Sequence, residues 1–130
     1  MKAAFKPVNR KNISLISLTQ EITKYNTTQV SNPVQSICSA VFSMTQLMQR
    51  RYMGYILSKY IKIWDFAAGL YLLQKTGVLT KYKNNKKLTL SVSDLCDLSK
   101  TGIERWKLKS EAIFTLSEGD FKYISENISF

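Results

Sequence analysis

Hydrophobic residues gather along the chain in short runs that polar segments separate. Apolar and β-branched residues are dense in the runs that predict strands, at 13–18, 34–37, 53–57, 78–82, 88–92 and 112–116. After the second run, apolar residues recur at three- and four-residue spacing over 39–48, which predicts an amphipathic helix that ends at 49–51. Strand-like and helix-like segments therefore alternate.

A second helix is predicted over 63–77, where apolar residues occupy most faces. Asp65 is a capping-type residue near its beginning, and Gly77 is a typical helix terminator. Because it has so many apolar faces, we expect this helix to be mostly buried. Asp65 would then lie at the start of the most buried helix of the protein.

The remaining segments have weaker patterns. They predict a short helix over 19–25 with Thr19 as its cap, polar turns at 26–33 and 83–87, an irregular stretch with one helical turn over 93–110, and a closing helix over 118–128. Alternating strands and helices predict a layered α/β domain with a mixed, mostly parallel sheet of about five strands and helices on its faces. The length of 130 residues suits one such domain, over 12–130, after a basic lead-in at 1–11.

Charge is distributed unevenly along the chain. The first 64 residues carry nine basic side chains and one acid, Glu21, within a total formal charge of +10. Such an excess favours a polyanionic partner or an anionic substrate. The lysines of 83–87, however, have only Tyr82 beside them for base stacking, so we interpret this segment as a solvated turn and regard nucleic acid as an unlikely partner.

The absence of histidine removes Ser-His-Asp, Cys-His and histidine-bound zinc chemistry from consideration. Cys38 and Cys96 are far apart in the sequence and are predicted to be free thiols in a reducing compartment. Since no apolar run approaches the ~18 residues of a membrane span, and 1–12 lacks an apolar signal region, we expect a cytoplasmic protein without a membrane contact.

One sequence motif points to a specific family of proteins. The run Ile63-Trp64-Asp65-Phe66-Ala67-Ala68-Gly69, followed by Gly77, resembles the C-terminal W-D-x-A-A-G signature of the inositol monophosphatase family. Upstream, Cys38-Ser39-Ala40 resembles the G-S-A start of a helix in that family, and Met53-Gly54-Tyr55 resembles its D-G-Y strand. The likeness is good over 34–82 and implies the C-terminal half of an inositol-monophosphatase-like fold.

The resemblance implies a magnesium-dependent phosphomonoesterase that acts on a sugar phosphate, an inositol phosphate or a nucleotide 3′-phosphate. It makes Asp65 a ligand of Mg²⁺ and places Ser39 and Ala40 at the substrate. Carboxylate oxygens suit this cation, and a helix N-terminus favours a phosphate close by. The small residues 67–69 would let the helix approach its neighbours closely. Alternatively, Asp65 is a plain helix cap.

Several family features are missing. No Asp precedes Asp65, so the N-terminal metal ligands, a Glu and the D-P-[IL]-D-G-[ST] stretch, have no counterpart. Other family positions are replaced by Cys38 for Gly, Arg50 for a small residue at the helix exit, Met53 for Asp, Ser58 or a neighbour for a substrate-contacting Glu, and Val78 for Gly. We therefore expect a truncated, split or decaying phosphatase half that is inactive as a lone chain and binds Mg²⁺ weakly or not at all.

Such a half is expected to expose an apolar face. It would pair with a separate N-terminal half or associate with itself. A second hypothesis rests only on the charge of the first half of the chain: a small basic module that binds nucleic acid or an acidic partner.

Overall fold

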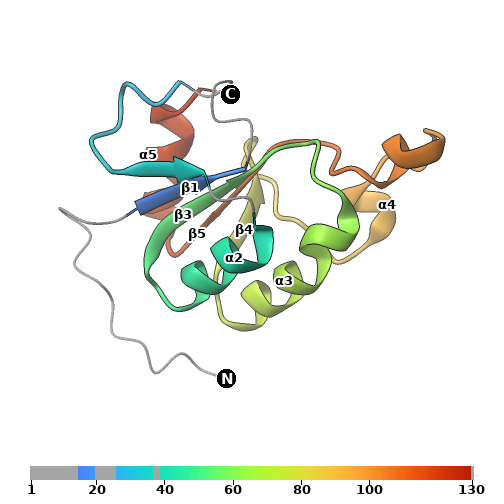
Figure 1. Ribbon diagram of the computed structural model, residues 1–130, viewed down its shortest axis with the longest axis horizontal. Coiled ribbons are helices and arrows are strands. Elements are labelled where there is room, and N and C mark those ends of the chain that lie inside the picture. The colour runs from blue at the N-terminus through green and yellow to red at the C-terminus, as the bar shows by residue number, and fades with distance from the viewer. Residues whose placement is uncertain (1–14, 20–25, 37–38, 130) are drawn as a thin grey trace.

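The computed structural model describes residues 15–19, 26–36 and 39–129, and within them the chain forms a five-stranded mixed sheet (Figure 1). The strands are β1 (Leu15–Leu18), β2 (Val34–Ser36), β3 (Tyr52–Leu57), β4 (Leu79–Tyr82) and β5 (Ala112–Thr115), in the order β2-β1-β3-β5-β4. β1 pairs in parallel with β2 and β3, and β5 pairs antiparallel with β3 and β4. Only β5 of these strands therefore runs against the others, which confirms the predicted mixed, mostly parallel sheet.

Helices cover both faces of the sheet. α2 (Ala40–Met48) and α3 (Ile63–Lys75) lie on one face and α5 (Glu118–Asn127) on the other (Figure 1). α4 (Val92–Leu95) and the 3₁₀ turn η2 (Gly102–Trp106) belong to the long connection between β4 and β5. Each face has its own apolar cluster, one including Phe66, Leu70 and Leu73 of α3, the other Phe121 and Ile124 of α5.

Successive side chains of β1 point to opposite faces of the sheet and contact the helices on each face. Ile16 and Leu18 belong to the cluster under α5, and between them Ser17 meets Ser43 of α2, with hydroxyl oxygens 3.1 Å apart. Both serines are fully buried. A buried hydroxyl without a partner is costly, so this pair fixes how α2 sits on the sheet.

The predicted strand over 88–92 is wrong. Lys87 makes an isolated bridge to Lys81, and the Leu88 N–H donates to the Thr80 carbonyl (3.0 Å), but the pairing does not continue as a strand. The reason is a local polar interaction that sequence periodicity does not reveal. The Asp94 carboxylate accepts a hydrogen bond from the Thr89 hydroxyl (2.7 Å) and draws the chain into α4.

α3 begins at Ile63, as predicted, and Gly77 follows its end, as predicted. Gly77 has φ +80°, and the next residue, Val78, donates its N–H to the Leu73 carbonyl (3.0 Å), a left-handed helix end that favours glycine. At the other end the N-cap is Lys62, so Asp65 lies within the first turn and is not the cap.

α3 is also less buried than predicted. Only three of its side chains are buried, Phe66, Leu70 and Leu73. Its outer side carries Trp64, Tyr71 and Leu72, which are 61%, 49% and 48% exposed. The apolar residues on most faces of this helix therefore serve two different surfaces, one inside the molecule and one outside.

The outer apolar surface continues onto α2. Val41 is 67% exposed and Phe42 is 46% exposed, and α2 packs beside α3 on the same face of the sheet (Figure 1). We call the five side chains of this surface the outer helix face: Val41, Phe42, Trp64, Tyr71 and Leu72. This agrees with the expected exposed apolar face.

Some predictions concern residues outside the described ones. They are the lead-in at 1–11, the predicted helix over 19–25 beyond Thr19, residues 13–14 and 37 at the ends of two predicted strands, and Cys38. Cys96 is a free, buried cysteine, as predicted. No helix in the described ranges is long and apolar enough to cross a lipid bilayer.

Candidate functional site

The candidate site lies where two helices begin. α2 follows β2 and α3 follows β3, and both strands run parallel to β1, so the two helix N-termini lie at the same edge of the sheet. The carboxyl edge of parallel strands is where α/β proteins commonly bind ligands. The exposed N–H groups and partial positive charge of helix N-termini favour an anion there.

Ser39 is the N-cap of α2. Its hydroxyl oxygen accepts a hydrogen bond from the Phe42 N–H (3.1 Å), which satisfies one of the free amides of the first turn. Ser39 is exposed and Ala40, the first residue of the helix, is partly exposed. The hydroxyl of Ser39 thus has a structural task, and the substrate contacts predicted for both residues stay a prediction.

Asp65 is in the first turn of α3 and is exposed. Its N–H donates to the Lys62 carbonyl (2.9 Å), which fixes its backbone. Among the residues that the structure describes, no hydrogen bond or ion pair engages its carboxylate. Asp65 thus lies at a helix start, as predicted, and its metal role stays a prediction.

Ser58 explains how the chain enters α3. Its N–H donates to the Thr19 hydroxyl (3.0 Å), and its own hydroxyl accepts from the Tyr60 N–H (3.1 Å). Ser58 is only 6% exposed. The buried Ser58 hydroxyl therefore shapes this turn. That Ser58 or a neighbour replaces a substrate-contacting Glu stays a prediction.

The residues present do not make a complete magnesium site. The described part of the chain holds no group of three or more His, Cys, Asp or Glu side chains arranged to hold a metal ion. Mg²⁺ is usually held by one or two carboxylates together with phosphate oxygens and water. Asp65 offers one carboxylate at the sheet edge, so its neighbours in this chain do not supply the rest of a catalytic metal centre.

Basic residues adjoin Asp65. Lys59 and Lys62 precede it on the same connection, and an isolated antiparallel bridge pairs Lys62 with Lys107. Lys59 and Lys62 are close to Asp65 in the sequence, whereas Lys107 is more than forty residues away. No signal along the sequence could have found it, because the bridge depends on the path of the long β4–β5 connection.

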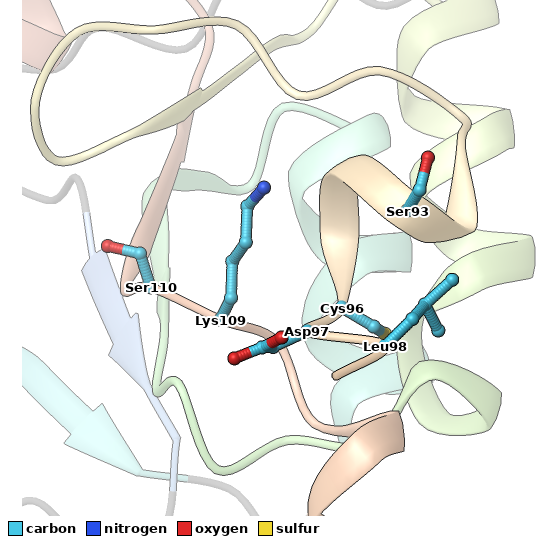
Figure 2. Close-up of a pocket in the computed structure, with 6 residues that line it drawn as sticks. All are labelled: Ser93, Cys96, Asp97, Leu98, Lys109 and Ser110. Atoms are coloured by element: carbon cyan, nitrogen blue, oxygen red, sulfur yellow. The ribbon is translucent and has the colours of Figure 1, made fainter. Parts of the chain in front are cut away.

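An open depression of about 470 Å³ lies elsewhere, at α4 (Figure 2). Figure 2 shows its lining residues, Ser93, Cys96, Asp97, Leu98, Lys109 and Ser110. The Asp97 carboxylate accepts hydrogen bonds from the side chain and backbone of Ser99, which hold the pKa of Asp97 below its usual value. Burial raises the pKa of the Cys96 thiol, which disfavours the nucleophilic thiolate. This depression therefore lacks an activated group.

No family model and no curated protein matches the sequence. Solved structures do match. A hypothetical protein from Pyrococcus horikoshii with similarities to inositol-1 monophosphatase aligns with a TM-score of 0.69 and 14% identity over 97% of this chain and 46% of its own. The MJ0109 gene product, an inositol monophosphatase–fructose 1,6-bisphosphatase, aligns with a TM-score of 0.67 and 16% identity over 96% of this chain and 46% of its own. Inositol monophosphatase from Anabaena aligns with a TM-score of 0.62 and 16% identity over 95% of this chain and 46% of its own.

At these identities the likeness is one of fold. The chain has the architecture of part of an inositol monophosphatase-type structure and spans less than half the length of the solved chains that it matches. That share fits the C-terminal half, as the W-D and G-S-A resemblances predicted.

Proposed function

We propose that this chain is the C-terminal portion of a magnesium-dependent phosphomonoesterase and that it is inactive alone. The observation that carries the proposal is the position of Asp65. The chain has the fold that the W-D resemblance implies. Asp65 is exposed and lies in the first turn of α3. The N-cap is Lys62, so Asp65 does not cap the helix itself, and its charge in the first turn also suits the helix dipole.

We expect the lone chain to be inactive because too few oxygen ligands for metal ions lie near Asp65 in its described part. Metal-assisted phosphate hydrolysis needs ions that activate water and neutralise the departing group, and such ions need several oxygen ligands held together. Within the described residues Asp65 has no carboxylate partners arranged for this purpose. A second polypeptide that brings the missing carboxylates would complete the site.

The outer helix face is the surface on which we place that second polypeptide. Five large apolar side chains remain exposed there, and the matched structures contain more than half of their length outside the matched part. An apolar surface of this kind is unusual in a monomer and typical of an interface. The occupant we propose is a complementary N-terminal half; in its absence the same face favours self-association.

The ligand class is a phosphorylated small molecule. A sugar phosphate, an inositol phosphate and a nucleotide 3′-phosphate all place a phosphate dianion at a helix N-terminus. The neutral Ser58 at the position of a substrate-contacting Glu weakens the case for inositol phosphate in particular.

The test is magnesium-dependent phosphate release. The purified chain is expected to release none from inositol 1-phosphate, fructose 1,6-bisphosphate or a 3′-nucleotide. Addition of a polypeptide that is encoded next to this chain and contains D-P-[IL]-D-G-[ST] should produce activity that Asp65→Asn abolishes. Activity that persists in the Asp65→Asn variant would refute the proposal, and Asp97→Asn is the matched control.

A further inference from the structure

Basic residues of two segments lie beside the start of α3. Lys59 and Lys62 lie on the β3–α3 connection, and Lys100, Arg105 and Lys107 lie on or next to η2. The bridge between Lys62 and Lys107, and a hydrogen bond from the Leu108 N–H to the Ile61 carbonyl (2.8 Å), hold the two segments side by side. Charges that are distant in the sequence thus share one place in the fold.

An aromatic ring positions two of these charges. The Lys59 ammonium nitrogen lies 5.6 Å from the centroid of the Tyr60 ring, and that of Lys107 lies 5.7 Å from the same centroid. Tyr60 is 45% exposed, so both ammonium groups are at the surface. Cation–π attraction restrains side chains that would otherwise be mobile, which lowers the entropic cost of binding an anion.

Among the described residues, Glu104 is the carboxylate that forms an ion pair with one of these cations. Lys107 donates to Glu104 (2.7 Å), and this hydrogen bond, with the charges of Lys107, Lys100 and Lys62, holds the pKa of the Glu104 carboxyl below its usual value. Several cations therefore act on a single acid that is itself exposed. The cluster keeps a positive excess that an anionic ligand can use.

We propose that Lys59 and Lys107, which lie over the Tyr60 ring, and Lys62, which bridges to Lys107, form a binding site for a multivalent phosphate anion. Ammonium groups are strong donors to phosphate oxygens. Lys62 is the N-cap of α3, a helix of 13 residues that no side chain caps, so its N-terminal partial charge acts in the same direction. A bound dianion takes the place of Glu104 as the partner of Lys107. The site needs no metal and does not depend on the metal role of Asp65.

The experiment is a calorimetric titration of pyrophosphate into the 130-residue chain without Mg²⁺, at fixed ionic strength. We expect saturable binding to one site, weakened about tenfold or more in the double variant Lys59→Gln/Lys107→Gln. The matched control is Lys86→Gln/Lys87→Gln, which makes the same charge change on the exposed 83–87 turn and should retain the wild-type affinity. Glu104→Gln should tighten binding, because it releases Lys107. Circular dichroism checks that each variant is folded.

Three results would overturn the proposal: binding that does not saturate, an equal loss in both double variants, or no effect of Glu104→Gln. Asp65→Asn removes a negative charge next to Lys62 and should therefore not weaken pyrophosphate binding; a loss as large as that of Lys59→Gln/Lys107→Gln would also overturn the site as described. Since this readout uses neither magnesium nor catalysis, failure of the anion site is distinguishable from failure of the proposed phosphatase function.

Discussion

The Met44 side chain on α2 lies directly against Gly69 on α3. A β-carbon at position 69 would overlap the Met44 sulfur and would lie 3.4 Å from its Cγ. Met44 is 1% exposed and has no open space to move into. The glycine of the W-D-x-A-A-G run is therefore the residue that lets the two helices of the candidate site pack closely, as the sequence predicted.

Gly69→Ala tests this packing. We expect the free energy of unfolding to fall by about 1–3 kcal/mol, because the new methyl group displaces a buried side chain. Urea denaturation measures the change. Gly119→Ala is the control, since its β-carbon would meet only the Ser117 hydroxyl at 3.9 Å and should leave stability unchanged or slightly raised. A Gly69→Ala variant as stable as the wild type would contradict the close contact.

Arg50 offers a stabilising substitution. It follows α2 with φ 59°, a left-handed conformation that favours glycine. Its Nη1 is buried, and no group in the described ranges accepts its hydrogen. Arg50→Gly should therefore raise the free energy of unfolding by about 1 kcal/mol. Arg51→Gly, at an exposed neighbour without positive φ, should lower it; if both variants lose stability equally, the strain at Arg50 is not real.

Tyr82 should make stability depend on alkaline pH. Burial, with smaller contributions from Asp94 and Cys96, raises the pKa of its phenol above the ordinary value of 10.0. Its contribution is fully present below pH 10, where the phenol is neutral in both states. As the pH rises further, the unfolded state ionises first, so stability falls by up to about 1.4 kcal/mol per pH unit.

The measurement is urea unfolding at pH 8 and at pH 11 for the wild type and Tyr82→Phe. The variant loses the hydrogen bond from the Tyr82 hydroxyl to the Asp94 carbonyl (3.0 Å) and should be about 1 kcal/mol less stable at pH 8. At pH 11 this difference should shrink or reverse. An unchanged difference between the two pH values would show that the phenol does not titrate abnormally.

Magnesium should bind weakly at Asp65. One carboxylate leaves most of the octahedral shell to water, so we expect a dissociation constant of about millimolar or weaker. The chemical shift of the Asp65 amide on titration with MgCl₂ reports it. Asp65→Asn should abolish the response, whereas Asp97→Asn should not. Micromolar affinity at Asp65 would contradict the conclusion that the described residues supply it with no further carboxylate ligands.

The sequence predicted those parts of the fold whose signals are local. Periodicity identified α2 and α3, and Gly77 marked the end of α3 because a left-handed residue there is a local requirement. The segment 88–92 was predicted wrongly, because its alternating pattern competes with the hydrogen bond between Thr89 and Asp94.

The candidate site was predictable only in part. Asp65 could be recognised because its motif is contiguous, whereas Lys107 reaches the same place only through a bridge between distant segments. The burial of α3 was overestimated for a related reason: apolar residues on two sides of a helix do not tell whether the second side meets the same chain or another one.

Sedimentation equilibrium of the purified chain tests most directly the claim that it is one half of a larger fold with an uncovered apolar face. The wild type should self-associate with increasing concentration. Trp64→Glu should shift it to monomer, and where both proteins are monomeric it should unfold like the wild type, since Trp64 is 61% exposed. Lys86→Glu on the exposed 83–87 turn should leave the association unchanged. A wild-type chain that stays monomeric at every concentration and unfolds only at high temperature would contradict the account.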